Sequence, residues 1–248
     1  SLWGMGIASR DLTGDQRDEL MLTSMGDQLM QVAQADGSYR GAPYDIGTYA
    51  QRPYVPGDGR PSTGWHASFA DVNNDGRADL FIAKGNVDQM PGMAMRDPNN
   101  LLIQGADGRF TEVGDTAGVA DIARSRGAAL ADFDGDGLLD LAVVNRRAPM
   151  RMYRNVTPEA GRFVRIAVRG AGGNRFAVGA RVIVTVGDTV QSQQVTLGGG
   201  HAGAVLAPLH FGIGDAAETT VQVRWPDGTQ SDPMRVTAGD QITVTQPD

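Results

Sequence analysis

The chain has 248 residues, no cysteine and a formal net charge of −7, from 29 acidic and 22 basic residues. The lack of cysteine excludes disulfides, thiolate metal sites and cysteine nucleophiles. No apolar run approaches the ~20 residues of a membrane-spanning helix, and no Lys/Arg block follows the pattern of a phosphate-binding surface. We therefore expect neither a transmembrane segment in this chain nor a nucleic-acid partner.

An acidic motif recurs at residues 11–20, 71–80 and 132–141, so that its copies start 60 and 61 residues apart. The copies read DLTGDQRDEL, DVNNDGRADL and DFDGDGLLDL. Short apolar runs with strand character flank them, and helical periodicity is almost absent. A unit of this length has the size of a four-stranded propeller blade. Because the run at residues 2–8 leads directly into the first motif, we expect the first blade to lack its opening strand.

After residue 157 the acidic loops end and alternating apolar residues take over, at 162–168, 180–186, 220–225 and 241–245. Gly and Asp-Gly turns separate these runs, which is typical of strands. The predicted fold is therefore all-β. A partial β-propeller of about three blades, at residues 1–157, precedes a small β-sandwich or barrel at residues 158–248, with Trp225 in its core.

The repeated motif has the form Asp-x-Asp/Asn-x-Asp-Gly-x-x-Asp, which suits Ca²⁺. This ion takes about six to eight hard oxygen ligands. Oxygens at positions 1, 3 and 5 converge when such a loop curls, Gly at position 6 permits the turn, and positions 7 and 9 add a backbone carbonyl and a carboxylate. The predicted metal ligands are Asp71, Asn73, Asp75, Arg77 and Asp79 in the second loop, Asp132, Asp134, Asp136, Leu138 and Asp140 in the third, and Asp11, Thr13, Asp15, Arg17 and Glu19 in the first.

Two calcium ions are expected, in the second and third loops, and a third ion in the first loop is left open. The first loop has Thr13 at position 3 and Gln16 at position 6, where a side chain with positive φ is strained. An EF-hand is excluded because position 12, which needs a bidentate Glu, is Leu22, Ile82 or Val143. The alternative is an Asp/Gly-rich hairpin that binds no metal and leaves its carboxylates crowded together.

Three later segments, 174–182, 209–214 and 223–228, read NRFAVGARV, LHFGIG and VRWPDG. On these segments the second unit resembles the ASPIC/UnbV domain, and the acidic repeats resemble the FG-GAP/VCBS repeats of integrin-type β-propellers. The chain is thereby similar to the cartilage acidic protein family. The resemblance implies an extracellular or periplasmic protein with calcium-binding hairpins and without established catalytic residues.

Propellers close with about four to eight blades, whereas this chain offers about three. Open strand edges promote aggregation. We therefore expect the chain to be part of a longer protein, or another polypeptide to supply missing blades or cover the edges as a complex partner.

These observations favour a non-catalytic, extracytoplasmic, calcium-binding module for protein–protein interaction, as a subunit or C-terminal part of a larger assembly. The first alternative is a carbohydrate-binding lectin or adhesion module, in which Tyr44, Tyr49, Tyr54 and Trp65 would contact a glycan. The second is a polysaccharide-acting enzyme. Against an enzyme, aromatic residues make up only 6% of the chain, and no pair of acidic residues stands apart from the three loops.

The three histidines are interpreted as structural residues. His66 and His210 fall in strand-like runs and His201 in a glycine-rich turn. Two long loops, 41–64 and the methionine-containing 85–100, are further candidates for partner contact, because long loops often carry binding residues and methionine adapts to irregular apolar surfaces.

Overall fold

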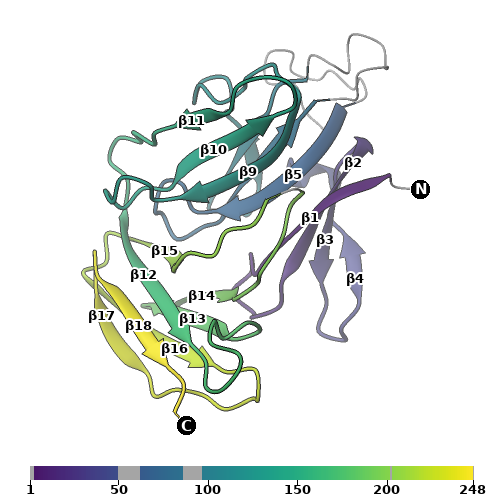
Figure 1. The fold of residues 1–248 in the computed structure, drawn as a ribbon. Helices are drawn as coiled ribbons and strands as arrows, with labels where there is room; N and C mark the ends of the chain where they lie inside the picture. Colours follow the sequence, from purple (N-terminus) through teal and green to yellow (C-terminus); the bar gives the residue numbers. More distant parts are fainter. Residues whose placement is uncertain (1–2, 50–61, 86–96, 202, 248) are drawn as a thin grey trace.

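The computed structural model describes residues 3–49, 62–85, 97–201 and 203–247. These residues form strands and one short 3-10 helix, Tyr44–Ile46, without an α-helix among them, which confirms the predicted all-β class (Figure 1). In the described part of the chain, no helix is long and apolar enough to cross a membrane.

The first three units are antiparallel meanders, as expected of propeller blades. In each, the first strand runs into the acidic loop and the chain returns as the second strand. The strands are β1 (Gly4–Arg10), β2 (Glu19–Gly26), β3 (Leu29–Ala33) and β4 (Tyr39–Gly41) in the first unit, β5 (Ser62–Ala70), β6 (Asp79–Lys84), β7 (Asn100–Gln104) and β8 (Phe110–Glu112) in the second, and β9 (Ser125–Ala131), β10 (Asp140–Asn145) and β11 (Arg151–Tyr153) in the third.

The expectation that the first blade lacks its opening strand is wrong. The apolar run before the first acidic motif is itself that strand, because β1 pairs with β2 from Ile7 opposite Leu22 to Arg10 opposite Glu19. It occupies the place that β5 and β9 take in the other units. Among the described residues, it is the third blade that has three strands.

Apolar side chains that alternate along the strands hold the blades together. On β6, Leu80 and Ile82 face one core together with Met21 of the first blade, whereas Phe81 packs against Val143 of the third. β6 is therefore buried along its whole length. A strand between two apolar neighbours has no solvent face, which is why its sequence reads as a continuous apolar run.

The strands after the third blade form a β-sandwich, which confirms the sandwich or barrel predicted for the C-terminal part of the chain. One sheet has the order β15-β12-β18 and the other β14-β13-β16-β17. The strands are β12 (Arg162–Arg169), β13 (Arg181–Val186), β14 (Thr189–Gln194), β15 (Leu209–Gly214), β16 (Glu218–Arg224), β17 (Met234–Thr237) and β18 (Gln241–Thr245). Val164 and Ile166 from one sheet meet Val182 and Val223 from the other, and Trp225 lies in this core as predicted. The predicted boundary between residues 157 and 158 falls in the β11–β12 connection and stays a prediction.

The sandwich is seated on the ends of the blades that carry the acidic loops (Figure 1). The N–H groups of Gly161 and Gly214 donate to the carbonyls of Asn73 and Asn74 in the second loop, both at 2.9 Å. The approach is close enough that a Cβ on Gly212 would lie 2.1 Å from the Asp71 carboxylate. Glycine permits this contact because it has no side chain.

The segment between β14 and β15 runs along the first strands of the blades. Gly200 exchanges two backbone hydrogen bonds with Ile7 of β1, at 2.6 and 3.3 Å. A Cβ on Gly203 would lie 2.8 Å from the carbonyl oxygen of Ala128 on β9. This segment therefore covers part of the edge of β1 that does not pair with β2, so the same chain protects a strand edge there.

Alanine substitutions at two glycines of the third loop distinguish the cost of backbone strain from the cost of a clash with the sandwich. Gly135 and Gly137 both have positive φ, but a Cβ on Gly135 meets nothing within 4 Å, whereas one on Gly137 would lie 1.9 Å from the Phe163 ring. We expect Gly135→Ala to lower the free energy of unfolding by about 1–2 kcal/mol, and Gly137→Ala by about 1–3 kcal/mol more. Urea unfolding in EDTA measures both, and equal losses would mean that Phe163 moves aside freely.

Candidate metal centre

The three acidic loops share one hydrogen-bonded shape. In each, the aspartate at position 1 accepts two backbone N–H groups from its own loop. Asp132 accepts those of Gly135 and Gly137, at 2.7 and 3.0 Å. Asp11 accepts the equivalent pair in the first loop, and Asp71 accepts those of Asp75 and Gly76 in the second. These bonds curl the loop around its first carboxylate and draw positions 3 and 5 toward it.

Positions 4 and 6 of every loop adopt the left-handed backbone conformation. Gly76 and Gly137 take position 6 with φ of 88° and 92°, and Gln16 takes it in the first loop with φ of 65°. The strain predicted for Gln16 is therefore present, because this conformation costs a non-glycine residue roughly 1–2 kcal/mol. Asn74 stands at position 4 of the second loop with φ of 59°, and asparagine tolerates this region better than most residues.

The third loop brings three predicted ligands together. One oxygen each from Asp132, Asp134 and Asp136 lies within 4.8 Å of the others. Two oxygens on opposite sides of a calcium ion are at most about 5 Å apart, since each Ca–O distance is about 2.3–2.6 Å. The spacing of these carboxylates therefore fits one calcium ion.

Two arginines offset the negative charge of this cluster. Arg154 reaches Asp134 through Nε at 2.7 Å and Asp136 through Nη2 at 3.0 Å. Arg165, from the sandwich, pairs with Asp132 at 2.7 Å. The Arg154 contacts are solvent-exposed and therefore weak, so a cation that coordinates the same oxygens can replace this guanidinium.

The second loop places Asp71, Asn73 and Asp75 on one turn. The N–H of Asp75 donates to oxygens of both Asp71 and Asn73, each at 3.1 Å, so those two oxygens lie side by side. The Asp75 carboxylate in turn accepts from the guanidinium of Arg77. In the first loop Arg17 contacts Asp15 in the same way at 2.6 Å. An arginine thus stands beside the position-5 carboxylate in all three loops.

The carboxylate at position 9 has a role that sequence reasoning missed. In the second loop, Asp79 accepts the N–H of Val72 at 3.0 Å and that of Gln104 on β7 at 2.9 Å. Glu19 and Asp140 accept equivalent pairs, from the loop and from a segment in or just after the third strand. All three carboxylates are buried. Position 9 therefore ties each loop to its blade, whether or not its oxygens also coordinate a metal.

Burial perturbs the acidic groups of the second loop most. Removal from water raises the pKa of Asp71 to about 6 and the pKa of Asp79 to about 7, although backbone N–H groups partly oppose the shift. Burial also raises the pKa of Glu19. At Asp136, by contrast, the N–H of Leu138 is the largest cause of a lowered pKa. A cation in the second loop would favour the ionised forms that burial disfavours.

The sandwich contacts all three loops through polar side chains. Ser192 donates to Asp11 at 2.6 Å in the first loop, and His210 Nε2 bonds Asn74 at 2.7 Å in the second. Arg165 pairs with Asp132 in the third loop. No sequence signal could locate these partners, because more than thirty residues separate each from its loop. Only the docking of the sandwich brings them together.

His66 and Trp65, which the sequence analysis also considered, are held by contacts with neighbouring residues. His66, on β5, is 2% exposed and bonds Ser68 and the backbone of His201. The indole of Trp65 donates to a backbone carbonyl. Arg126 Cζ lies 4.0 Å from the centroid of its ring and the His201 ring centroid 5.0 Å from it, so a sugar would compete with these neighbours for the ring.

The aromatic candidates for glycan contact are only partly described. Tyr44 is 79% exposed, with its ring centroid 4.5 Å from that of Tyr49. Tyr54 and the methionines of the 85–100 loop lie outside the described residues.

Comparison with known proteins finds one family match in each half of the chain. Residues 93–143, which include the whole third loop, match the FG-GAP-like repeat, and residues 170–248 match the family described as ASPIC and UnbV. Cartilage acidic protein 1 of Mus musculus and that of Homo sapiens are each 27% identical to this chain over 163 residues. These matches cover 64% of the chain but only 25% and 24% of the two relatives.

Cartilage acidic protein 1 of Xenopus tropicalis is 30% identical over 109 residues, which are 42% of this chain and 17% of that protein. The matched region thus spans about a quarter or less of each of these relatives. The three segments on which the ASPIC/UnbV resemblance was stated lie inside the matched ASPIC and UnbV region. This chain joins FG-GAP-like repeats to an ASPIC/UnbV domain, and in that combination it is similar to the cartilage acidic proteins.

Proposed function

We propose that this chain is a non-catalytic, calcium-binding interaction module of an extracellular or periplasmic assembly, and that its calcium is structural. The observation that supports the proposal most is the third loop, where Asp132, Asp134 and Asp136 offer oxygens within 4.8 Å of one another. The second loop offers Asp71, Asn73 and Asp75 on an equivalent turn. The first loop has the same backbone shape, but Thr13 replaces the carboxylate or amide at position 3 and Gln16 is strained at position 6, so its affinity for the ion is expected to be lowest.

The donor set favours calcium over other metals. The side chains that converge in the loops are oxygen donors, and the chain has no cysteine. Oxygen-only loops exclude a typical zinc site, and the irregular geometry suits calcium better than the strict octahedron of Mg²⁺. Extracellular calcium modules work at dissociation constants of about 10⁻⁴–10⁻³ M. Partly exposed loops of this kind fit that range, and the relatives named for cartilage support the same location.

Bound calcium would act on the fold through the loops. Each loop connects two blade strands and also contacts the sandwich, so an ordered loop holds both. Repulsion among the carboxylates of a metal-free loop opposes the curled shape that these contacts need. Calcium in these loops would therefore strengthen the junction between the FG-GAP-like repeats and the ASPIC/UnbV domain.

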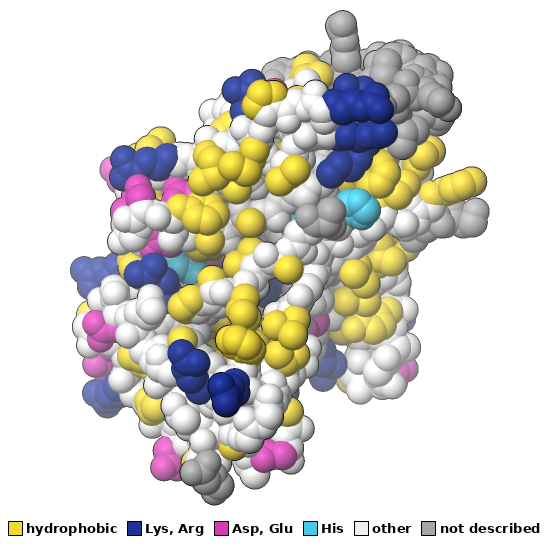
Figure 2. All heavy atoms as spheres, in the orientation of Figure 1, with side chains coloured by type: hydrophobic (Ala, Val, Ile, Leu, Met, Phe, Trp, Pro, Cys, Tyr) yellow, Lys and Arg dark blue, Asp and Glu magenta, His cyan; other side chains and the backbone are white. Residues whose placement is uncertain are grey.

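The third blade provides a surface for a partner or for further blades. Among the described strands, β11 pairs only with β10. Met150, Met152 and Val156, in and around β11, are each more than half exposed. Figure 2 shows hydrophobic side chains gathered over this part of the molecule. An unpaired edge beside exposed apolar side chains is a typical docking surface for another polypeptide.

Removal of one ligand tests the third loop. Asp136→Asn withdraws a position-5 charge from the cluster, and we expect native mass spectrometry in Ca²⁺ to show one ion fewer than in the wild type. Stability in EDTA should change little, because the Asp136 side chain is exposed and its pair with Arg154 is weak. Asp107→Asn, in the exposed β7–β8 turn, is the control. An unchanged number of bound ions would contradict the assignment.

Asp140→Asn, in the same loop, should behave differently from Asp136→Asn. Its two oxygens accept the N–H groups of Phe133 and Asn155, and an amide can accept only one of them. We expect a loss of about 1–3 kcal/mol in the free energy of unfolding, with EDTA as well as with Ca²⁺. Urea unfolding under both conditions separates this structural role from that of Asp136. A loss that appears only in Ca²⁺ would mean that Asp140 acts solely as a ligand.

The pH dependence of stability tests the buried acids of the second loop. In the metal-free protein the pKa of Asp71 is about 6 and that of Asp79 about 7, whereas an unfolded aspartate has a pKa of about 3.9. From about pH 4 to pH 7 the unfolded chain therefore ionises first, and these groups destabilise the fold as the pH rises. Because calcium binds the ionised forms, the calcium-induced rise in Tm should grow from about pH 5 to pH 8. Thermal melts with Ca²⁺ and with EDTA measure it, and a rise independent of pH would contradict the expectation.

A further inference from the structure

The first two blades each end in a short fourth strand, whereas the third blade ends, among the described residues, with β11. In the complete blades, β4 pairs antiparallel with β3, and β8 pairs antiparallel with β7. After β11 the chain leaves for the sandwich instead, and the N–H of Gly161 donates to the Asn73 carbonyl there. The place beside β11 is therefore the position of a fourth strand that the described part of the chain does not supply.

The hydrogen bonds of the position-9 acids show which residues are equivalent in the three blades. Asp79 accepts the N–H of Gln104 at 2.9 Å, and Asp140 accepts that of Asn155 at 2.8 Å. In the first blade the acid at position 9 accepts the N–H of Ala33 at 3.3 Å. Ala33, Gln104 and Asn155 thus hold the same place, at or just after the end of the third strand.

An aromatic residue stands opposite this place in both complete blades. Tyr39 of β4 pairs with Ala33, and Phe110 of β8 pairs with Gln104. Phe110 is 5% exposed and lies in the core that its blade shares with Met21 of the first blade. The fourth strand of the second blade therefore covers an edge and also inserts a ring between two blades.

The corresponding place between the second and third blades is an open groove of about 570 Å³. Most of the residues that line it are apolar, and they include Phe81 and Leu101 of the second blade and Leu141 of the third. Asn155, at the place that faces the aromatic ring in the other blades, lines it too. The groove therefore lies where a ring equivalent to Phe110 would enter.

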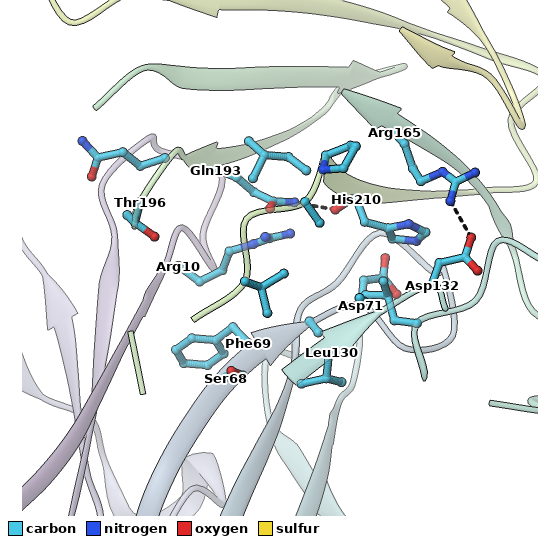
Figure 3. Close-up of a pocket in the computed structure, with 18 of the residues that line it drawn as sticks. Arg10, Ser68, Phe69, Asp71, Leu130, Asp132, Arg165, Gln193, Thr196 and His210 are labelled. Atoms are coloured by element: carbon cyan, nitrogen blue, oxygen red, sulfur yellow. Dashed lines mark hydrogen bonds and ion pairs between the residues drawn. The ribbon is translucent and has the colours of Figure 1, made fainter. Parts of the chain in front are cut away.

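The side chains around the groove correspond to those around Phe110. Leu130 on β9 stands two residues before its acidic loop, as Phe69 does on β5, and Figure 3 shows both residues. Phe69 packs against the core that contains Phe110, whereas Leu130 lines the groove. Tyr153 holds the place of Leu102, because each pairs with the leucine at position 10 of its acidic motif. Leu102 is 1% exposed but Tyr153 is only partly buried, as expected of a site without its covering strand.

The surface beyond Tyr153 is positively charged. A second groove, of about 480 Å³, begins at Arg151 and is also lined by Arg124, Arg146 and Asp121. Three arginines and one aspartate give these lining residues a net charge of +2. Arg151 pairs with Asp121 at 3.3 Å, but the arginine is exposed and the pair is therefore weak. On a chain with a net charge of −7, this local positive charge favours an acidic partner.

We propose that an extended segment of a partner polypeptide completes the third blade by pairing antiparallel with β11. An aromatic residue of the segment enters the groove opposite Asn155, and an acidic residue four positions later lies opposite Arg151. The two residues point to the same face, because side chains of a strand alternate with a period of two. In strand addition of this kind, backbone hydrogen bonds supply affinity and side-chain pockets supply specificity. The inference names the partner chemistry of the third-blade surface and thus rests on the proposed interaction function.

A labelled peptide, Gly-Ser-Phe-Thr-Val-Thr-Glu-Gly, tests the proposal on the whole chain in Ca²⁺. Fluorescence anisotropy measures its binding, and hydrogen exchange should slow at residues 151–153 when it binds. Replacement of the peptide phenylalanine by alanine should weaken binding about 10-fold or more, because the buried ring is lost. A peptide of the same composition that ends Glu-Thr-Gly carries its acid on the other face and should also bind more weakly.

A charge exchange tests the register of the pairing. Arg151→Glu should weaken binding of the acidic peptide about 3-fold or more, since an attraction becomes a repulsion. A peptide with lysine in place of its glutamate should bind the Arg151→Glu chain better than it binds the wild type. Arg235→Glu, at an exposed ion pair of the sandwich, is the matched control and should change neither affinity. If Arg235→Glu has the same effect as Arg151→Glu, the register is wrong.

A blocked groove provides the second variant. Ala117 is exposed and lines the groove, so Ala117→Trp should fill it and abolish binding without disturbing the core. The proposal would be overturned by the absence of saturable binding at about 1 mM peptide, by binding that Ala117→Trp leaves unchanged, or by a wild-type dimer that protects β11 with a second copy. Native mass spectrometry of the same samples counts calcium. A wild-type chain without calcium would contradict the proposed function, whereas a calcium-loaded chain that ignores the peptide would contradict only this inference.

Discussion

The structure depends on carboxylates that accept backbone N–H groups. At positions 1 and 9 of each acidic loop, a buried or nearly buried acid binds two such groups, and between them they set the curl of the loop and its attachment to the blade. These bonds favour the ionised acid, while burial and neighbouring acids disfavour it. The raised pKa values of Asp71 and Asp79 show that burial prevails in the metal-free second loop. A bound cation is the simplest way to resolve this conflict.

The same loops are the surface on which the ASPIC/UnbV domain rests. Ser192, His210 and Arg165 each contact a different loop, and Gly212 and Gly137 allow backbone and ring to approach without a gap. Changes in the loops are therefore transmitted to the sandwich through direct contacts. The calcium that we propose for the loops would therefore act on this junction between the two units.

The arginines complete the electrostatic picture. Arg17, Arg77 and Arg154 each lie beside a position-5 acid, although they come from different places in their units. The first two are at position 7 of their own loops, whereas Arg154 follows β11 and compensates for Leu138 at that position. An exposed arginine, held by a weak ion pair, thus lies beside each loop in which calcium could bind. Such pairs limit repulsion before the metal binds without competing strongly against it.

The sequence by itself determined the all-β class, the three blades, the sandwich with Trp225 in its core, and the positions of the acidic loops. Those properties follow from local spacing: alternation along strands, and glycine or asparagine where φ must be positive. Only the tertiary structure showed that β1 is a true opening strand, that position 9 closes the loop against the third strand, and that Arg165, Ser192 and His210 reach the loops. Each of these contacts joins residues that are far apart in the chain or depends on which neighbour covers an edge, and local spacing carries no information about either.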